Sequence, residues 1–289
     1  MTNVCTAGLD VGFASLDYLQ IFILGVIQGI TELLPVSSTA HMRVVPALLG
    51  WQDPGSAFSA MQLAALAAVV SYFWRDVRQV VSGSIGAVRQ GDYDSPWFKL
   101  AVAIVLATVP ICIAGLALSS TLNACNSPLR GLMVIGISCV VMAVLLAAAE
   151  LRARHTREVS QMRLRDALIV GVAQIGALIP GVSRSGSTLT AALFLNFKRE
   201  EAARFSFLLG LPAIALAGLK ELWVLLHAEL PAHAWPHLLF GLVVASVSAF
   251  FAIWGLMKFL ERFSTWPFVI YRALLGVFLI VAVSTGLLS

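Results

Sequence analysis

The sequence predicts an all-α integral membrane protein that forms a single membrane domain over residues 1–289. Hydrophobic residues make up 59% of the chain, charged residues 12%, and the mean hydropathy is +0.90. Soluble domains average about 45–50% apolar and about 25% charged residues. Apolar runs close to the roughly 20 residues that a helix needs to cross a bilayer recur at 57–74, 100–119, 130–149, 206–226, 236–257 and 267–288. We therefore expect six transmembrane helices.

The N-terminal stretch and the cysteines point to no catalytic or metal-binding site. "MTNVCTAGLDVGFASLDYLQ" has no basic region and no clear cleavage site, so we expect no removable signal peptide. Cys112 and Cys139 lie in apolar runs, where a buried thiol is the ordinary interpretation. Cys5 and Cys125 could pair in an oxidising compartment.

Two further segments are apolar but broken. Residues 17–49 and 165–196 each contain a proline and a Ser/Thr cluster about halfway along. The pieces on either side run to roughly 12–18 residues, mostly too short to span a bilayer. Such segments are typical of re-entrant helical hairpins, whose irregular tips are tolerated only where they line a cavity inside the protein.

The two hairpins resemble each other. "GVIQGITELLPVSST" (25–39) aligns without a gap with "GVAQIGALIPGVSRS" (171–185), which places Gln28 on Gln174 and Ser37 on Ser183. Farther on, "FSAMQLAALAAVV" resembles "FSFLLGLPAIALA" in the same order. We infer an internal duplication, with repeat 1 over about 17–150 and repeat 2 over about 165–288. Each repeat is a hairpin followed by three crossings, an odd number, so the second repeat has inverted topology.

The positions of Lys and Arg predict the orientation. This topology puts 14 of them on one side and two, Arg130 and Lys220, on the other, while Arg43, Arg184 and Arg272 lie within membrane segments. Cytoplasmic loops carry the excess of basic residues. Both termini and the mouth of hairpin 1 are therefore expected to face outward. The pI near 9.1 reflects this topology, and no nucleic-acid partner is expected. The 14 residues are Arg75, Arg78, Arg89, Lys99, Arg152, Arg154, Arg157, Arg163, Arg165, Lys198, Arg199, Arg204, Lys258 and Arg262.

The tip of the second hairpin, "IPGVSRSGSTLTAALF" (179–194), has the composition of an anion site. Gly181 and Gly186 permit close backbone approach, and Arg184 offers a planar fork of five donors. Hydroxyl groups come from Ser183, Ser185, Ser187 and Thr188. A Ser/Gly-rich turn that leads into a helix N-terminus suits phosphate. The alternative is a turn that only caps a half-helix, with Arg184 reaching a membrane interface.

The tip of the first hairpin lies in "VIQGITELLPVSSTAHMRVV" (26–45). Gln28 and Glu32 are four residues apart, so they share one helix face and could supply oxygen ligands to Mg²⁺ or Ca²⁺. Ser38 and His41 are three apart, a spacing that suits a nucleophile and a general base. The alternative is structural: Ser37 caps the helix, Glu32 pairs with an internal cation, and His41 is a core histidine.

Two motifs carry a family resemblance. "QGITELLPVSSTAH" (28–41) and "PGVSRSGST" (180–188) resemble the "(E/Q)GxTExxPVSSxxH" and "PGxSRSGxT" motifs of the bacterial undecaprenyl-diphosphate phosphatase family, which is associated with bacitracin resistance. "FKREEAARFSFLLGLP" (197–212) and the pair Tyr271–Arg272 also resemble that family. Ala40 replaces a usual glycine, and Leu33 a common phenylalanine. Gln28 stands where glutamate is an alternative, which removes one negative charge from any metal site.

The resemblance implies a function and a set of roles. The family hydrolyses undecaprenyl diphosphate to undecaprenyl phosphate, which recycles the lipid carrier for peptidoglycan and cell-wall synthesis. It works in the bacterial inner membrane, among membrane lipids, and dimerises. Glu32 with Gln28 would hold the divalent cation, Arg184 would clamp the diphosphate, and Ser38 with His41 would perform or assist the attack. The expected phosphate site is completed by Ser37, Thr39, Gly181, Ser183, Ser185 and Thr188.

Two interpretations of other classes remain open at this point. Inverted repeats with broken helices are also an architecture of transporters, so a polyprenyl-phosphate flippase is the alternative function. Such a carrier needs Arg184 and helix N-termini but has no use for the Ser38–His41 pair beside the metal-ready carboxylate of Glu32. A structural scaffold would not need Glu32 and Arg184 inside the membrane. The attacking group is also open, because His41 or a metal-bound water could replace Ser38.

Overall fold

The computed structural model describes residues 5–6, 9–10, 12–118, 129, 131–228, 230–231 and 233–288, and these are almost entirely helical. The only strands among them are the residue pairs β1 (Cys5–Thr6) and β2 (Leu9–Asp10). The 3₁₀ segments are η1 (Gly12–Ser15), η2 (Ser56–Met61), η4 (Val159–Gln161) and η5 (Ile175–Leu178). The α-helices are α1 (Tyr18–Leu33), α2 (Ser38–Leu49), α3 (Gln62–Tyr72), α4 (Trp74–Gln90), α5 (Pro96–Ala117), α7 (Leu132–Arg152), α8 (Leu164–Gln174), α9 (Arg184–Phe194), α10 (Arg199–Leu226), α11 (Ala234–Leu260) and α12 (Trp266–Ser284).

Five helices are long and apolar enough to cross a membrane: α5, α7, α10, α11 and α12. They coincide with five of the six expected crossings, and the protein is an all-α multi-pass membrane protein. The run at 57–74 folds differently, as η2 followed by α3, which has 11 residues. A helix of that length rises about 16 Å, roughly half of a bilayer core. The sixth crossing and the inverted topology therefore stay predictions.

The two broken segments form pairs of short helices, α1 with α2 and α8 with α9, as the prolines and serines predicted. Both second helices begin with the same backbone geometry. Ser37 and Ser183 have φ of 74° and 71°, and their hydroxyls accept hydrogen bonds from the N–H groups of Ala40 and Gly186. A positive φ is uncommon for a residue other than glycine. Its occurrence at two aligned positions supports a common origin for the two hairpins.

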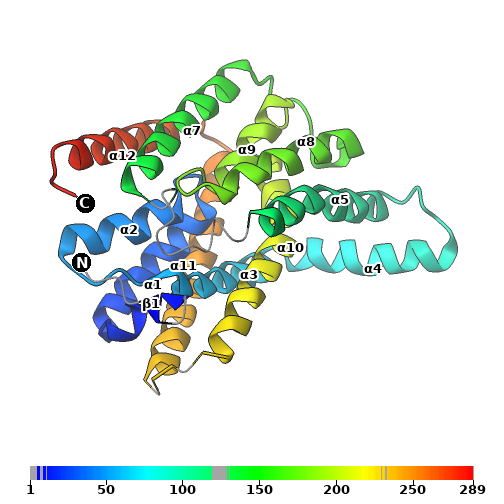
Figure 1. Cartoon of the computed structure of the whole chain (residues 1–289). Coiled ribbons are helices and arrows are strands. Elements are labelled where there is room, and N and C mark those ends of the chain that lie inside the picture. The colour runs from blue at the N-terminus through cyan, green and yellow to red at the C-terminus, as the bar shows by residue number, and fades with distance from the viewer. Residues whose placement is uncertain are drawn as a thin grey trace.

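The two halves of the chain interdigitate. Helix α1 packs along α11, whereas its counterpart α8 packs along α5, and α7 packs along α12 (Figure 1). Close approach depends on small residues: a Cβ at Gly25 would lie 3.2 Å from the Gly241 carbonyl oxygen, and one at Gly171 would lie 2.2 Å from the Ala107 carbonyl oxygen. Each hairpin is thus held by the other half of the molecule. The α4–α5 pair lies to one side of this body (Figure 1).

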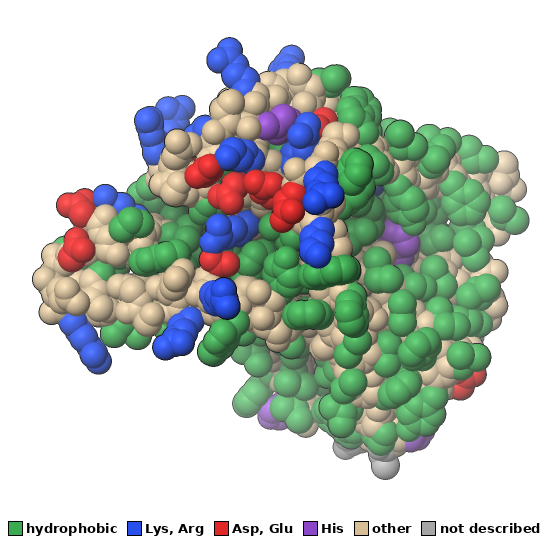
Figure 2. Space-filling model, turned by 180° about the vertical axis from the view of Figure 1, so that it is seen from behind, with side chains coloured by type: hydrophobic (Ala, Val, Ile, Leu, Met, Phe, Trp, Pro, Cys, Tyr) green, Lys and Arg blue, Asp and Glu red, His purple; other side chains and the backbone are tan. Residues whose placement is uncertain are grey.

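Charged side chains gather at one end of the molecule, while hydrophobic side chains cover most of the rest of the face in Figure 2. The end is crosslinked by ion pairs that join separate elements: Arg157–Asp166, Arg199–Glu150, Arg204–Asp76 and Lys198–Glu158. The hydrogen bond from Lys198 lowers the pKa of Glu158 below its usual value. Seven of the residues that carry the predicted cytoplasmic excess belong to α8, α10 and the loops before these two helices, so the asymmetry in sequence corresponds to a clustering in space.

The cysteine expectations have separate outcomes. Cys139 is fully buried in α7, as expected, and Cys112 is partly buried in α5; both are free thiols. Cys125 lies outside the described residues, so the possible pairing with Cys5 stays untested.

We predict that Gly171→Ala destabilises the protein because the new methyl group meets the backbone of α5. Overpacking of this kind costs about 1–3 kcal/mol, which corresponds to a drop in Tm of roughly 3–10 °C for a protein of this size. Gly255→Ala is the matched control, since a Cβ there meets nothing within 4 Å. Thermal unfolding in detergent, followed by circular dichroism, measures both. Equal Tm values for the two variants would contradict the packing described here.

Candidate active site

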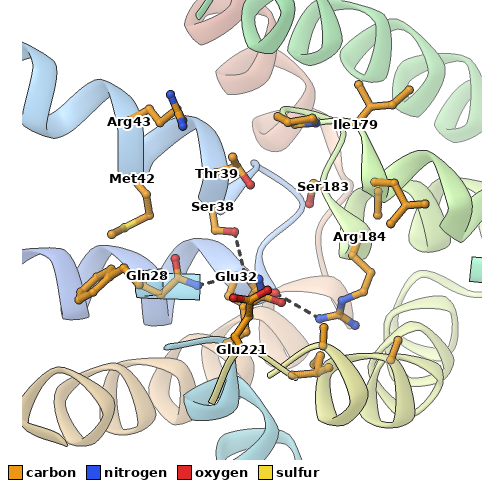
Figure 3. Close-up of a pocket in the computed structure, with 18 of the residues that line it drawn as sticks. Gln28, Glu32, Ser38, Thr39, Met42, Arg43, Ile179, Ser183, Arg184 and Glu221 are labelled. Carbon is orange, nitrogen blue, oxygen red and sulfur yellow. Dashed lines mark hydrogen bonds and ion pairs between the residues drawn. The ribbon is translucent and has the colours of Figure 1, made fainter. Parts of the chain in front are cut away.

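A pocket of about 520 Å³ lies where the two hairpin tips meet α10 (Figure 3). Its polar wall contains Gln28, Glu32 and Ser38 from the first tip and Ser183 and Arg184 from the second. Apolar side chains of α5, η5 and α10 form much of the remaining wall. The pocket therefore brings together residues that are about 150 positions apart in the sequence.

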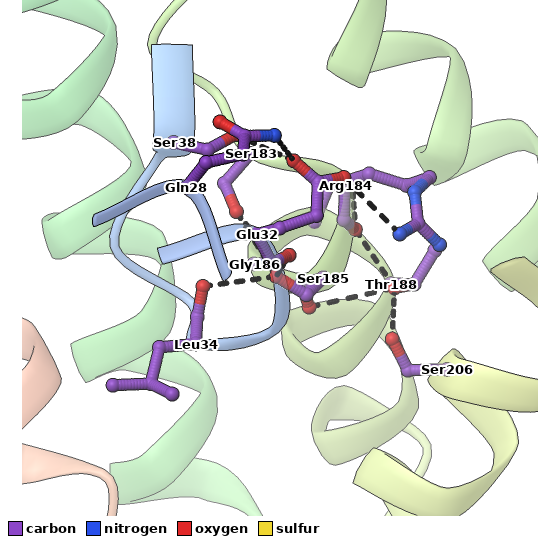
Figure 4. Close-up of polar contacts among 11 residues, drawn as sticks. Gln28, Glu32, Leu34, Ser38, Ser183, Arg184, Ser185, Gly186, Thr188 and Ser206 are labelled. Carbon is purple, nitrogen blue, oxygen red and sulfur yellow. Dashed lines mark hydrogen bonds and ion pairs between the residues drawn. The ribbon is translucent and has the colours of Figure 1, made fainter. Parts of the chain in front are cut away.

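Glu32 is the centre of this polar wall. Its Oε2 accepts hydrogen bonds from the Ser38 hydroxyl at 2.7 Å and from Gln28 Nε2 at 3.2 Å. Its Oε1 lies 3.5 Å from Arg184 Nη2, and the two side chains are 9% and 12% exposed. Figure 4 shows these contacts converging on the carboxylate. One carboxylate thus joins a potential nucleophile, an amide and a cation.

Local sequence explains these positions. Pro35 disfavours helical geometry in the residue before it, and α1 ends there with Leu34 extended at ψ 146°. Ser37 then caps α2, which makes Ser38 the first residue of that helix. Arg184 is likewise the first residue of α9, after the cap residue Ser183. Both helix N-termini, with their partial positive charge, therefore border the same pocket.

A glycine and two hydroxyl residues hold Arg184 and the second tip in position. A Cβ at Gly210 of α10 would lie 1.7 Å from Arg184 Nη1, so only glycine leaves room for the guanidinium. The Ser185 hydroxyl donates to the Leu34 carbonyl oxygen at 3.1 Å, which ties the second tip to the first. The Thr188 hydroxyl donates to the Arg184 carbonyl oxygen at 2.8 Å and is also hydrogen-bonded to Ser206 (Figure 4).

Arg272 of α12 is the strongest link between the tips. It is fully buried and donates to the carbonyl oxygens of Pro35 (3.0 Å), Gly181 (2.8 Å) and Val182 (2.9 Å). No carboxylate pairs with it among the salt bridges of the described residues. Its charge therefore adds positive potential close to the pocket while its donors satisfy both loops.

His41 does not meet Ser38, contrary to the spacing argument. Its Nδ1 lies 2.7 Å from the Ser37 carbonyl oxygen, its Nε2 lies 2.5 Å from the Tyr271 hydroxyl, and the two rings stack. The Ser38 hydroxyl is bound to Glu32 instead. The helix turn directs His41 toward α12 while Ser38 faces α1. In this geometry the carboxylate of Glu32, and not the ring of His41, accepts the hydrogen bond of the Ser38 hydroxyl.

The expected phosphate-binding residues divide into two groups. Thr39 and Ser183 line the pocket. The others support the tips from behind: Ser37 caps α2, the Gly181 carbonyl (φ +94°) accepts from Arg272, and the contacts of Ser185 and Thr188 are those given above. Hydroxyl-rich composition alone could not distinguish residues that face the pocket from residues that hold its walls.

The donor set fits Mg²⁺ or Ca²⁺ as a partial site. Glu32 offers a carboxylate, Ser38 a hydroxyl, and Gln28 an amide that turns its oxygen inward by rotation about its last bond; these are the oxygen ligands that both ions take. The described residues contain no cluster of three or more His, Cys, Asp or Glu placed for a metal. Such an ion would need substrate phosphate oxygens and water to complete its shell, as Mg²⁺ commonly does.

Four charged residues of the pocket were not singled out as site residues from the sequence. Arg43, Asp53, Lys220 and Glu221 also line it, and Figure 3 labels Arg43 and Glu221. Lys220 and Glu221 follow Ala213 and Ala217 at helical spacing, so they share the face of α10 that borders the pocket. That spacing, together with two charges in an apolar helix, was the signal that could have identified them.

Comparison with known proteins agrees with the motifs. The family model described as "Bacitracin resistance protein BacA" matches residues 21–278, a range that includes both tips and Arg272. The chain belongs to this family. It is 72% identical over 263 residues to "Undecaprenyl-diphosphatase 2" of Mesorhizobium japonicum, covering 91% of this chain and 100% of that protein. It is 51% identical to "Undecaprenyl-diphosphatase" of Gloeobacter violaceus, with 93% of each chain covered. The protein of the same name from Synechococcus elongatus is 48% identical, over 95% of this chain and 96% of its own.

We predict that Arg272→Met both destabilises the protein and impairs its site, because three buried carbonyl groups lose their donor. An unsatisfied buried polar group costs about 1–3 kcal/mol, so Tm should fall by roughly 5 °C or more. Arg272→Lys should restore part of the loss, since an ammonium can still donate to these carbonyls. Arg262→Met, at an exposed turn, is the control. A wild-type Tm for Arg272→Met would show that the tips do not depend on this residue.

Proposed function

We propose that this protein hydrolyses undecaprenyl diphosphate to undecaprenyl phosphate and inorganic phosphate, an activity that supplies the lipid carrier for cell-wall synthesis and counters bacitracin. The observation that carries the proposal is the Glu32 carboxylate between the Ser38 hydroxyl and Arg184, at two helix N-termini. Phosphoryl transfer needs mainly positioning and charge stabilisation, and this pocket offers both. The names of the relatives point to the same substrate.

In the proposed mechanism, the Ser38 Oγ attacks the terminal phosphorus and Glu32 takes its proton. The P–O bond of the anhydride breaks, and the lipid monophosphate leaves with the bonding electrons and takes the proton from Glu32, which becomes a carboxylate again. Water then attacks the phosphoserine, Glu32 again holds the proton, and the proton returns to Ser38 as inorganic phosphate leaves. Arg184 and the N-termini of α2 and α9 stabilise the charge on the phosphoryl oxygens. Tyr271 and the Ser37 carbonyl fix the ring of His41 beside the first tip, where the histidine positions the loop.

A divalent cation, Mg²⁺ or Ca²⁺, belongs to the proposal. Glu32 and Gln28 would hold it, and it would neutralise charge on the diphosphate. The isoprenoid tail then lies against the apolar part of the pocket wall, formed by Ile111, Leu178 and Ile179. A tail in that position reaches membrane lipid past α5, whose apolar side chains are the least buried of the five long helices.

We also infer six crossings in two inverted repeats within the bacterial plasma membrane, with both termini and the pocket mouth outward. The matching caps at Ser37 and Ser183 and the reciprocal packing of α1 on α11 and α8 on α5 support the repeats. The clustering of basic residues at one end of the molecule supports the orientation. Homodimers are expected from the family resemblance alone.

We predict that purified protein releases phosphate from undecaprenyl diphosphate and that a chelator suppresses the release. Glu32→Gln and Ser38→Ala should each lower kcat at least about 100-fold, since they remove the proton acceptor and the nucleophile. Ser246→Ala is the matched control, because that hydroxyl only bonds within α11. Substantial turnover by Ser38→Ala would exclude the serine mechanism, and a protein that moves the lipid without hydrolysing it would be a transporter.

The orientation is tested by labelling single cysteines with a membrane-impermeant reagent in intact cells. In a background without Cys5, Cys112, Cys125 and Cys139, Ala228→Cys should react and Asp92→Cys should react only after the cells are permeabilised. The reason is the 14-to-two distribution of Lys and Arg between the two sides. The reverse pattern would place the mouth of the pocket in the cytoplasm.

A further inference from the structure

The pocket carries further charges that the proposed hydrolysis does not use. Arg43 lies in the middle of α2, Asp53 lies in the loop after it, and Lys220 and Glu221 come from α10. Each cation lies near one carboxylate: Arg43 Nη1 is 3.7 Å from Asp53 Oδ2, and Lys220 Nζ is 3.8 Å from Glu221 Oε1. Two further cations thus line the pocket, and their side chains are more exposed than that of Arg184, at 28% and 54% against 12%.

Arg43 is placed to reach an anion that leaves the reaction centre. It lies on the same face of α2 as Thr39, and both line the pocket. It is five residues past Ser38, about 7.5 Å along the helix axis, a distance that a long arginine side chain spans in part. Its side chain is 28% exposed, so the guanidinium meets both the pocket and the outside water.

The contact between Arg43 and Asp53 is loose. Its 3.7 Å exceeds the 2.7–3.2 Å of a protein hydrogen bond, and a partly exposed pair of this kind adds little stability. Asp53 is held independently, because its Oδ1 accepts a hydrogen bond from the Gly55 N–H at 2.8 Å. The carboxylate is therefore fixed in its loop while the guanidinium is free to exchange it for another anion.

We propose that Arg43 binds the inorganic phosphate product as it leaves the pocket and that Asp53 then displaces the phosphate from Arg43. This inference rests on the proposed hydrolysis. After cleavage, Glu32 repels the phosphate from the inner wall, and the planar fork of Arg43 binds it bidentately one step farther out. The Asp53 carboxylate competes for the same fork, so the phosphate does not stay bound. The lipid monophosphate remains on the apolar side, against Ile111, Leu178 and Ile179.

The test uses inorganic phosphate itself as the probe. Product inhibition by phosphate is measured during hydrolysis of undecaprenyl diphosphate, and phosphate binding to the full-length protein in detergent is measured by calorimetry without lipid. Arg43→Ala should raise the Ki and the Kd for phosphate roughly ten-fold, the loss of one charged hydrogen-bonding partner. Arg43→Lys should fall between, and Asp53→Asn should lower both constants several-fold. Arg89→Ala, a basic residue of α4 away from the pocket, should change neither.

The opposite signs of the two variants make the proposal falsifiable. Unchanged phosphate constants in Arg43→Ala would overturn it, as would a shift of Asp53→Asn in the same direction as Arg43→Ala. A KM for the lipid that rises more than the phosphate Ki would show that Arg43 binds substrate rather than product. If wild-type protein hydrolyses nothing, the proposed function fails, while calorimetry still decides whether Arg43 and Asp53 govern phosphate binding.

Discussion

The carbonyl groups at the two helix breaks are the constraint on which this structure depends. Backbone polar groups inside a membrane must find partners within the protein, because lipid offers none. Arg272, in the second half of the chain, donates to Pro35 of the first tip and to Gly181 and Val182 of the second, and Ser185 of the second tip donates to Leu34 of the first. The first tip thus takes donors for Pro35 and Leu34 from the second half of the chain, and Arg272 joins the two tips directly. These bonds hold the tips together at the pocket.

The same constraint positions the charged groups around the pocket. Once the loops are fixed, α2 and α9 both start beside the pocket, and Glu32 faces Arg184 across it. The 3.5 Å between them is long for an ion pair, while Glu32 keeps closer bonds to Ser38 and Gln28. A phosphate can bind the guanidinium of Arg184 without breaking the hydrogen bond between Ser38 and Glu32 that orients the Ser38 hydroxyl. Without substrate, the contact between Glu32 and Arg184 thus neutralises both charges inside the protein, and the substrate phosphate can replace it.

Sequence patterns predicted the secondary-structure elements more accurately than they predicted the contacts between side chains. Apolar length identified five long helices, and prolines with serines identified both breaks, because these depend on local composition. The run at 57–74 divided into η2 and α3, since only packing shows where a helix is interrupted. The i, i+4 spacing of Gln28 and Glu32 gave a real contact. The i, i+3 spacing of Ser38 and His41 did not give a contact, because the His41 imidazole is hydrogen-bonded to Tyr271, more than 200 residues away in the sequence. Spacing shows which side chains share a face, but not which distant partner that face meets.

The internal duplication that we infer from the sequence accounts for the different side chains that equivalent positions bring to this pocket. The alignment that places Ser37 on Ser183 also places Ser38 on Arg184 and Glu32 on Leu178. Ser38 and Arg184 are each the first residue of a half-helix, so two equivalent positions became a nucleophile and a cation that face one space. The carboxylate has only an apolar counterpart. Gln174, the counterpart of Gln28, is fully buried, and its amide has no hydrogen-bond partner in the described part of the chain. Similar helix caps with divergent side chains thus give a polar site with an apolar side, which suits a substrate with a charged head and a long hydrocarbon tail.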